Sequence, residues 1–318
     1  MRPFRFGLVH TGGPVADLAR RAEDEGYDTL LFPDHLGCWD PFVAAVAATA
    51  ATTRLRAGSQ VVNNELRNVG LLAQSAASAH VLSGGRFELG IGTGYAAEEH
   101  EAIGQVLPGA GDRVDRLAAT VDALRRLAAG EEVDVDEARV RLARVRLSGS
   151  PPADGEDGPM PLVPDPLPAA MPVMVGGNGD RLLGLAARLA DTVQFVGFSA
   201  TDAGPSLTHF SFDGLADRHA VVRAAAGDRF DDLELSALVQ YVVPGDTPVA
   251  AAATIPAVQD GRLDAEAVLD SPFVLLGPPP AMVDRLSELR DRFGISYVTV
   301  FESRQERFAE VVAALAGR

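Results

Sequence analysis

Residues 29–39, TLLFPDHLGCW, place a short strand directly before a polar loop. The first four residues are apolar or β-branched without interruption, as in a strand that is buried on both faces of a parallel sheet. Pro33 has no backbone N–H group to donate, so the strand should end there. Asp34 and His35 follow at the carboxyl end of the strand, where parallel α/β folds carry their chemistry. A purely structural alternative is that Asp34 caps a turn and His35 packs against its neighbour.

The same pairing of a short apolar strand with a following helix recurs along the chain. Strands are predicted at residues 4–10, 29–32, 55–62, 87–93, 172–175, 192–196, within 233–243 and at 295–301. Helices are predicted at residues 15–25, 42–52, 68–82, 112–129, 179–190, 216–226, 281–293 and 305–315. Eight such units predict an α/β fold closed into a (β/α)8 TIM barrel. The alternative is an open doubly wound sheet. It is disfavoured because the glycine pairs Gly90/Gly92 and Gly177/Gly179 lack the third small residue of a dinucleotide-binding fingerprint, with Tyr95 and Leu182 in its place.

Three stretches interrupt this regularity and are predicted to be insertions into a single domain that spans residues 1–318. Residues 131–171 are expected to form a surface excursion with a small hairpin and a mobile part near 150–168. Residues 199–217 are expected to be largely irregular, and residues 244–272 to contain short helices.

Composition excludes several classes of function. A net charge of −16 and a pI near 4.7 argue against nucleic acid as a partner. All 28 basic residues are arginine, so the chain has no Schiff-base or P-loop lysine. Cys38 is the single cysteine, which rules out a disulfide within the chain and a cysteine-based metal cluster. No run approaches the roughly 18 apolar residues of a membrane span, and the start lacks a signal-peptide core, so a cytoplasmic protein is expected.

Polar or glycine-rich turns also follow later strands. The candidate groups are Asn63, then Thr93, Gly94 and Tyr95, then Gly177, Asn178 and Gly179. The turn at 177–179 offers free N–H groups at a helix start, which is an anion site that needs no lysine, although a plain turn is an alternative. Glu98, Glu99 and Glu101 are interpreted as a solvated helix N-terminus rather than an acid/base pair. The histidines form no metal-binding pattern, so no metal site is predicted.

Three motifs resemble those of one family. Residues 83–95, SGGRFELGIGTGY, closely resemble the fourth-strand signature of the luciferase-like monooxygenase superfamily, whose members are TIM barrels that bind FMN or the deazaflavin coenzyme F420. Residues 32–39, FPDHLGCW, resemble the second-strand segment of its F420-dependent branch. Residues 175–180, VGGNGD, followed by LAARLAD at 185–191, are similar to the family's phosphate-side loop and helix. The resemblance runs from the first strand to the eighth and is weakest in the insertions.

The resemblance implies roles for residues in each of these loops. In F420-dependent dehydrogenases of this family the Asp and His of the second loop lie against the deazaflavin and the Trp stabilises the reacting intermediate, which implies these roles for Asp34, His35 and Trp39. A bulge with a non-prolyl cis peptide is expected behind the ring, near residues 59–60 or just beyond. The cofactor-binding residues implied are Asp34, His35, Ser59, Gln60, Val61, Asn63, Thr93, Gly94, Tyr95, Gly177, Asn178 and Gly179.

One departure from the family pattern limits the expected substrate. Sugar-phosphate dehydrogenases of this branch carry a Glu proton donor where this chain has Tyr95, and the chain has no lysine to hold a sugar phosphate. We therefore do not expect a glucose-6-phosphate dehydrogenase. We expect an F420-dependent oxidoreductase that transfers a hydride between C5 of the deazaflavin and a small, apolar organic substrate, with His35, Trp39 and Tyr95 as catalytic residues.

Two alternatives stay open at this point. One is an FMN-dependent monooxygenase that works with a separate reductase, and the other is a catalytically silent paralogue that binds the cofactor. The family also implies a homodimer, to which the Ala-rich helix at 42–52 could contribute.

Overall fold

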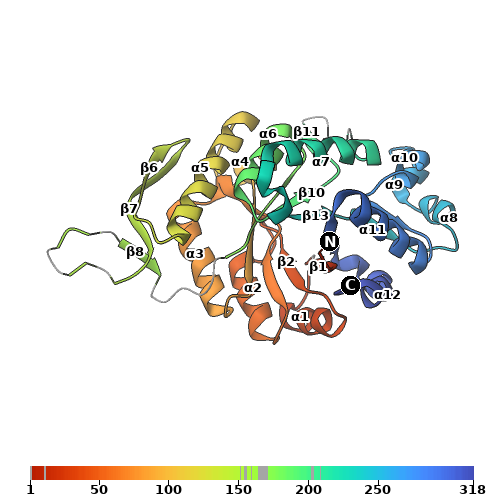
Figure 1. Cartoon of the computed structure of the whole chain (residues 1–318), viewed down its shortest axis with the longest axis horizontal. Helices are drawn as coiled ribbons and strands as arrows, with labels where there is room; N and C mark the ends of the chain where they lie inside the picture. Colours follow the sequence, from red (N-terminus) through yellow and green to blue (C-terminus); the bar gives the residue numbers. More distant parts are fainter. Residues whose placement is uncertain are drawn as a thin grey trace.

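The barrel predicted from the sequence is present in the computed structural model. The structure describes residues 2–10, 12–150, 152–153, 156–158, 160–163, 171–201, 204–207 and 209–318. The barrel strands are β1 (Arg5–Val9), β2 (Thr29–Phe32), β3 (Arg56–Ser59) continued by β4 (Val62–Asn63), β5 (Phe87–Gly92), β9 (Val173–Gly177), β10 (Thr192–Phe195), β13 (Glu234–Leu238) and β16 (Ile295–Phe301). All are parallel to their neighbours, and the pairing of β3 and β4 with β5 closes the sheet into a (β/α)8 barrel (Figure 1).

An outer ring of helices covers the barrel. It consists of α1 (Val15–Asp24), α2 (Pro41–Ala50), α3 (Val69–Leu82), α5 (Ala110–Ala128), α6 (Asp180–Leu189), α7 (Phe212–Ala226), α11 (Pro279–Phe293) and α12 (Gln305–Leu315). Asn68 caps α3 by accepting hydrogen bonds from the N–H groups of Gly70 and Leu71. The helix α7 begins earlier than predicted because the Ser211 hydroxyl accepts a hydrogen bond from Gly214 N at 3.1 Å and so caps an extra turn.

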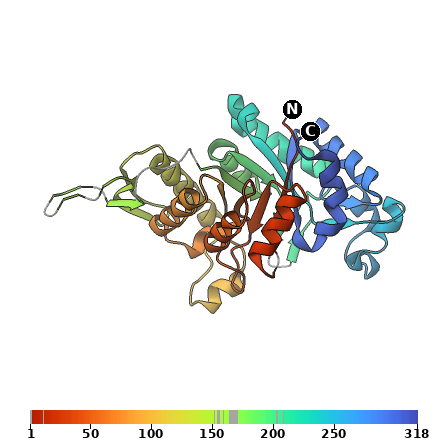
Figure 2. The ribbon, with the colours of Figure 1, turned by 90° about the horizontal axis from the view of Figure 1, so that it is seen from below.

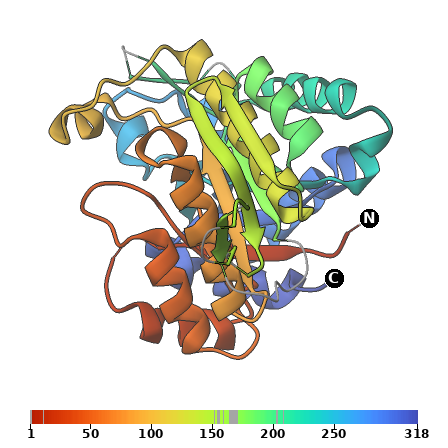
Figure 3. The same cartoon turned by 90° about the vertical axis from the view of Figure 1, so that its left-hand side faces the viewer.

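The first insertion is more regular than expected. It forms a three-stranded sheet of β6 (Val133–Glu137), β7 (Val140–Ser148) and β8 (Met160–Val163), in which the predicted hairpin of β6 and β7 gains β8 as a parallel third strand. This sheet contacts α3 and α5 and lies outside the barrel (Figure 3). About half of the predicted mobile part near 150–168 lies outside the described residues, and Met160–Val163 within it form β8.

The other insertions follow later barrel strands. A short hairpin of β11 (Ser199–Thr201) and β12 (Gly204–Ser206) replaces part of the irregular stretch expected after β10. The short helices expected in the third insertion are α8 (Pro248–Ala252), α9 (Pro256–Gln259) and α10 (Ala265–Leu269), bracketed by an unpredicted parallel pair, β14 (Tyr241–Val243) and β15 (Val274–Leu276). Short 3-10 turns complete the chain at η1 (Asn64–Leu66), η2 (Gly227–Asp232) and η3 (Glu302–Arg304). Among the described residues, no helix has the length and apolar character needed to cross a bilayer.

A further helix, α4 (Ala97–Ala102), carries Glu98 and Glu99 in its first turn and so matches the helix N-terminus expected there, although no bounds were predicted for it. It follows β5 and, with the loop that leads to α5, projects from the body of the molecule (Figure 2). Its position at the carboxyl end of a barrel strand brings α4 to the end of the barrel where the candidate site lies.

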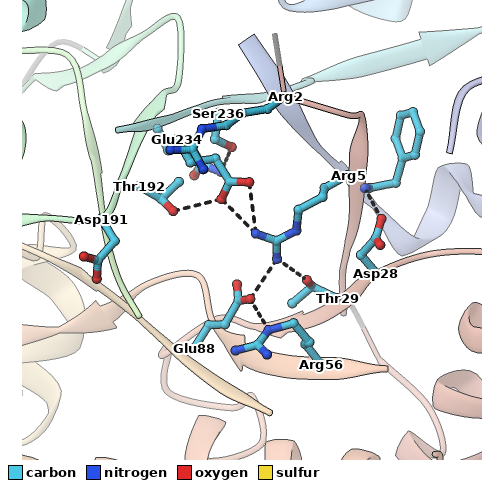
Figure 4. A network of polar contacts seen from close by, with 12 residues as sticks. Arg2, Arg5, Asp28, Thr29, Arg56, Glu88, Asp191, Thr192, Glu234 and Ser236 are labelled. Carbon is cyan, nitrogen blue, oxygen red and sulfur yellow. Dashed lines mark hydrogen bonds and ion pairs between the residues drawn. The ribbon is translucent and has the colours of Figure 1, made fainter. Parts of the chain in front are cut away.

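The amino end of the barrel is closed by charged side chains (Figure 4). The Arg5 guanidinium donates to Glu234 at 2.8 Å and to Glu88 at 2.7 Å, and Glu88 also pairs with Arg56. The Tyr297 ring lies 4.4 Å from the Arg5 Cζ atom. Burial alone would lower the pKa of Arg5, but the two carboxylates outweigh that effect and raise it. With this end filled by paired charges, the open loops at the carboxyl end of the strands are left for chemistry.

Candidate active site

Asp34 fastens the loop after β2 to the loop after β4. Its two carboxylate oxygens accept hydrogen bonds from Arg67, at 2.5 Å from Nη2 and 3.2 Å from Nε. The backbone N–H of Asn63 donates to the same carboxylate at 3.0 Å. Arg67 also reaches Asp40, the N-cap of α2, at 3.0 Å. Asp34 therefore links two loops through an ion pair and does not cap a turn. Both oxygens of its carboxylate accept hydrogen bonds from within the protein.

His35 contacts two side chains from the segment after β5. Its Nδ1 atom lies 2.7 Å from Glu99 Oε1, and its Nε2 atom lies 3.2 Å from the Tyr95 hydroxyl. The His35 and Tyr95 rings meet edge to face with centroids 5.6 Å apart. Burial and the nearby Glu99 charge raise the pKa of Tyr95, so its phenol is protonated at neutral pH. The alternative in which His35 only packs against its sequence neighbour is wrong.

The open end of the barrel, formed by the loops that follow the strands, is called the mouth below. Trp39 and Cys38 lie at its rim and not in its wall. The Trp39 side chain is 61% exposed, and the Cys38 thiol is free and exposed. Leu36, in the same loop, is also exposed. The predicted role of Trp39 in stabilising the reacting intermediate stays a prediction, and in the structure its indole is open to solvent.

The third barrel strand is broken at the expected bulge. A non-prolyl cis peptide bond joins Gln60 to Val61, between β3 and β4, as expected. The Ser59 hydroxyl is fully buried, donates to the carbonyl of Gly90 and accepts from its N–H, and so joins two strands. Gln60 donates to Thr299 at 3.3 Å, and its buried side-chain oxygen has no partner.

The turn after β5 is shaped by close packing against the third strand and its loop. A Cβ atom at Gly94, where φ is +74°, would lie 2.2 Å from the Asn63 side-chain oxygen. At Gly92 a Cβ would lie 2.7 Å from a Val61 methyl group. Glycine is therefore required at Gly94 by both its backbone conformation and its contacts. Thr93, directly before it, is half-buried.

The turn after β9 has the features of an anion site. The helix α6 begins after Gly179, whose lack of a side chain leaves the first N–H groups uncapped. The Asn178 side chain is 4% exposed, and neither of its amide atoms has a partner. A Cβ at Gly179 would meet no atom within 4 Å, so there is open space at the helix start. The phosphate of a cofactor fits these features, because it would pair with the open N–H groups and the buried amide.

The predicted residues thus fall into two neighbouring groups at one end of the barrel. One is built from the loops after β2, β4 and β5 and contains Asp34, His35, Asn63, Gly94 and Tyr95. The other is the anion turn after β9, the strand that pairs with β5. Within the described ranges, no three His, Cys, Asp or Glu side chains are grouped so that they could hold a metal ion.

The family model described as luciferase-like monooxygenase matches residues 9–268. The chain belongs to the luciferase-like monooxygenase family. It is 31% identical over 263 residues to a protein of Nakamurella multipartita named F420-dependent glucose-6-phosphate dehydrogenase, covering 77% of this chain and 69% of that protein. Family membership makes the chain an oxidoreductase.

Solved structures support the same fold. An F420-dependent secondary alcohol dehydrogenase, solved with an F420–acetone adduct, aligns with a TM-score of 0.72 at 16% identity and covers 99% of both chains. A riboflavin lyase, solved with modified FMN and riboflavin, aligns with a TM-score of 0.70 at 16% identity and covers 98% of this chain and 91% of that one. At these identities the likeness establishes the luciferase-like TIM barrel.

Within this luciferase-like barrel, Glu99 is the site residue that the sequence did not predict. It was assigned to a solvated helix N-terminus, yet its side chain is only 20% exposed and turns back to His35. Helical spacing gave no signal for this contact, because Tyr95 lies before α4 begins at Ala97. Glu98, next to it, is exposed as predicted.

Proposed function

We propose that this chain is an F420-dependent oxidoreductase that acts on a small organic substrate. The observation that carries the proposal is the pairing of His35 with Tyr95 at 3.2 Å beside an anion turn with a buried, unpartnered amide. The F420-dependent relative and the F420-dependent structural neighbour support the choice of cofactor. When bound, the deazaflavin would accept or donate the hydride at C5.

The chain's own residues would then divide the remaining work. Gly177, Asn178 and Gly179 would bind the phosphate through backbone N–H groups and the Asn178 amide. Gln60 and Val61 would lie behind the ring, and Thr93 and Gly94 beside it. His35 and Tyr95 would exchange a proton with the substrate.

An uncharged substrate suits the groups around the mouth. The chain has no lysine, and the Arg67 guanidinium is held by Asp34 and Asp40. Leu36 and Trp39 add exposed apolar surface at the rim. These features support a small apolar alcohol or carbonyl compound and argue against a sugar phosphate, although the Nakamurella relative is named for one.

FMN is the second candidate cofactor. The neighbour solved with modified FMN has the same barrel, and an uncapped helix start would accept the FMN phosphate as well as that of F420. This alternative would make the chain a monooxygenase that needs a separate flavin reductase.

Titration of the purified protein with each cofactor tests the choice. Trp39 is the only tryptophan and is exposed at the rim, so its fluorescence reports binding there. We expect saturable quenching by F420 and none by FMN. The reverse preference would identify the monooxygenase, and no response to either would contradict both candidates.

We also propose that two copies pair through α2 and α3. These adjacent helices carry no Asp, Glu or Arg over their combined length. Their outer faces instead expose apolar side chains, with Val43 70% and Leu71 64% exposed. Exposed apolar side chains without charged neighbours are typical of a protein interface. Sedimentation of a Val43→Glu/Leu71→Glu variant should give a monomer from a dimeric wild type. A monomeric wild type would contradict this proposal.

A further inference from the structure

We propose that Glu99 is a positioning residue that makes Tyr95 and His35 a proton relay, in which Tyr95 is the member that meets the substrate. This inference rests on the proposed function for its substrate. It rests on the structure alone for the arrangement of the three side chains. His35 comes from the loop after β2, Tyr95 from the turn after β5 and Glu99 from the first turn of α4, and each makes a contact that fixes the role of the next.

The contacts determine where the proton on His35 resides. A carboxylate accepts hydrogen bonds and has none to give, so Glu99 Oε1, at 2.7 Å, requires a hydrogen on His35 Nδ1. In the neutral imidazole Nε2 then carries the lone pair. The Tyr95 hydroxyl, 3.2 Å from Nε2, must donate to it. Glu99 thereby selects the one neutral tautomer in which His35 can take a proton from Tyr95.

Exposure determines the order of the relay. Tyr95 is 60% exposed, the His35 side chain 34% and the Glu99 side chain 20%. The second oxygen of Glu99 is buried and has no partner. The phenol is therefore the outermost group, the imidazole lies behind it, and the carboxylate is at the inner end.

The proton movement can be written with every bond balanced. For an alcohol substrate, the substrate O–H bond breaks and its proton bonds to the Tyr95 oxygen, while the Tyr95 hydroxyl proton passes to His35 Nε2. Tyr95 ends neutral, and His35 becomes an imidazolium that Glu99 stabilises through the hydrogen bond to Nδ1. A bound deazaflavin would accept the hydride from the carbon that carries the hydroxyl group, which would leave the substrate as a carbonyl compound. The reverse sequence protonates a carbonyl substrate.

The test begins with the cofactor-free protein and therefore does not depend on turnover. Nitrogen-15 NMR of the histidine rings, with His35 assigned from a His35→Gln spectrum, should give the Nδ1–H tautomer in the wild type. Glu99→Gln should give a mixture of tautomers, because an amide can either donate or accept. Glu98→Gln is the matched control, since Glu98 is the exposed neighbouring carboxylate, and should leave the tautomer unchanged.

Kinetics supplies the second readout. With F420 and an alcohol that the wild type oxidises, Glu99→Gln should lower kcat about 10- to 100-fold and leave KM and the F420 dissociation constant nearly unchanged. Tyr95→Phe should lower kcat at least as much while keeping the His35 tautomer. An Nε2–H tautomer in the wild type, or a Glu99→Gln variant with unchanged tautomer and kcat, would overturn the relay. Loss of all F420 binding with the Nδ1–H tautomer intact would instead overturn the proposed function and support the arrangement of Glu99 and His35.

Discussion

At the amino end of the barrel, Arg5 is held by Glu88 and Glu234, whereas at the carboxyl end the buried amide of Asn178 and one oxygen of Glu99 have no partner. Leaving a buried polar group unpaired costs about 1–3 kcal/mol, so a fold would not be expected to keep such groups for stability alone. The charged side chains of the amino end, here called the floor, therefore hold strands together, whereas the carboxyl end leaves the Asn178 amide available for a ligand. If this contrast is correct, substitutions at the two ends should affect different properties.

The largest expected effect is at the mouth. Replacing His35 with alanine should lower turnover of F420 with a panel of small alcohols about 1000-fold, because general acid/base groups contribute on that order. The unfolding midpoint in urea should change little, since the side chain is a third exposed. Cys38→Ser, in the same loop, serves as the control and should retain activity. Full turnover by His35→Ala would remove the proposed role.

A substitution at the floor should show the opposite pattern. Arg5→Met leaves Glu88 and Glu234 without their shared cation, and breaking a buried ion pair on one side costs about 3 kcal/mol of unfolding free energy. Cofactor affinity should be retained. The matched control is Arg20→Met, which breaks an exposed pair with Asp17 and should cost less than about 0.5 kcal/mol. Equal losses in the two variants, measured by urea denaturation, would show that the floor network does not stabilise the fold.

The anion turn should separate affinity from stability. Asn178→Ala removes the unpartnered amide, so we expect cofactor binding to weaken about 10-fold, or about 1.4 kcal/mol, with little change in the urea midpoint. Asn68→Ala removes a helix cap instead and should cost about 1 kcal/mol of stability without changing affinity. Calorimetric titration of both variants checks this. Unchanged affinity in Asn178→Ala would contradict the phosphate assignment.

The smallest expected effect is a pH dependence at the outer edge of the floor. Burial opposes ionisation of Glu23, but hydrogen bonds from the backbone N–H groups of Leu55, Arg54 and Thr53 outweigh it and lower its pKa to about 2. Because this lies below the unfolded value of about 4.3, the stabilisation is complete above about pH 5 and is lost as the pH falls toward 2.

A substitution at Glu23 tests that sign. Glu23→Gln should lose about 1 kcal/mol at pH 7, and the difference from wild type should shrink on acidification. Asp24→Asn, an exposed neighbour, provides the control and should show no such trend. A difference that grows as the pH falls would contradict the assignment.

Much of the barrel was predictable because each strand carries its own local signal. The run at Thr29–Phe32 is apolar throughout and ends at a proline, and the fourth strand begins after two glycines. The pair β14 and β15 was missed, since each has only three residues and their pairing joins segments about thirty residues apart without a local pattern. The start of α7 was misplaced because a capping serine was not recognised.

The site was predictable as a set of residues but not as a set of contacts. His35, Tyr95 and Asn178 were named because they follow strands whose carboxyl ends meet in a barrel. The contact of His35 with Glu99 spans 64 residues of sequence and depends on how α4 turns back toward the mouth, so no local pattern predicts it. The ion pair of Asp34 with Arg67 likewise joins residues that are far apart in the sequence.

The free thiol at the rim has a practical consequence. Cys38 is the only cysteine, is exposed, and lies between His35 and Trp39 in sequence. A maleimide-linked spin label or fluorophore would therefore attach at one known position without any background substitutions. Its spectrum would follow how crowded the entrance becomes when small molecules enter, even for a compound that the enzyme does not turn over.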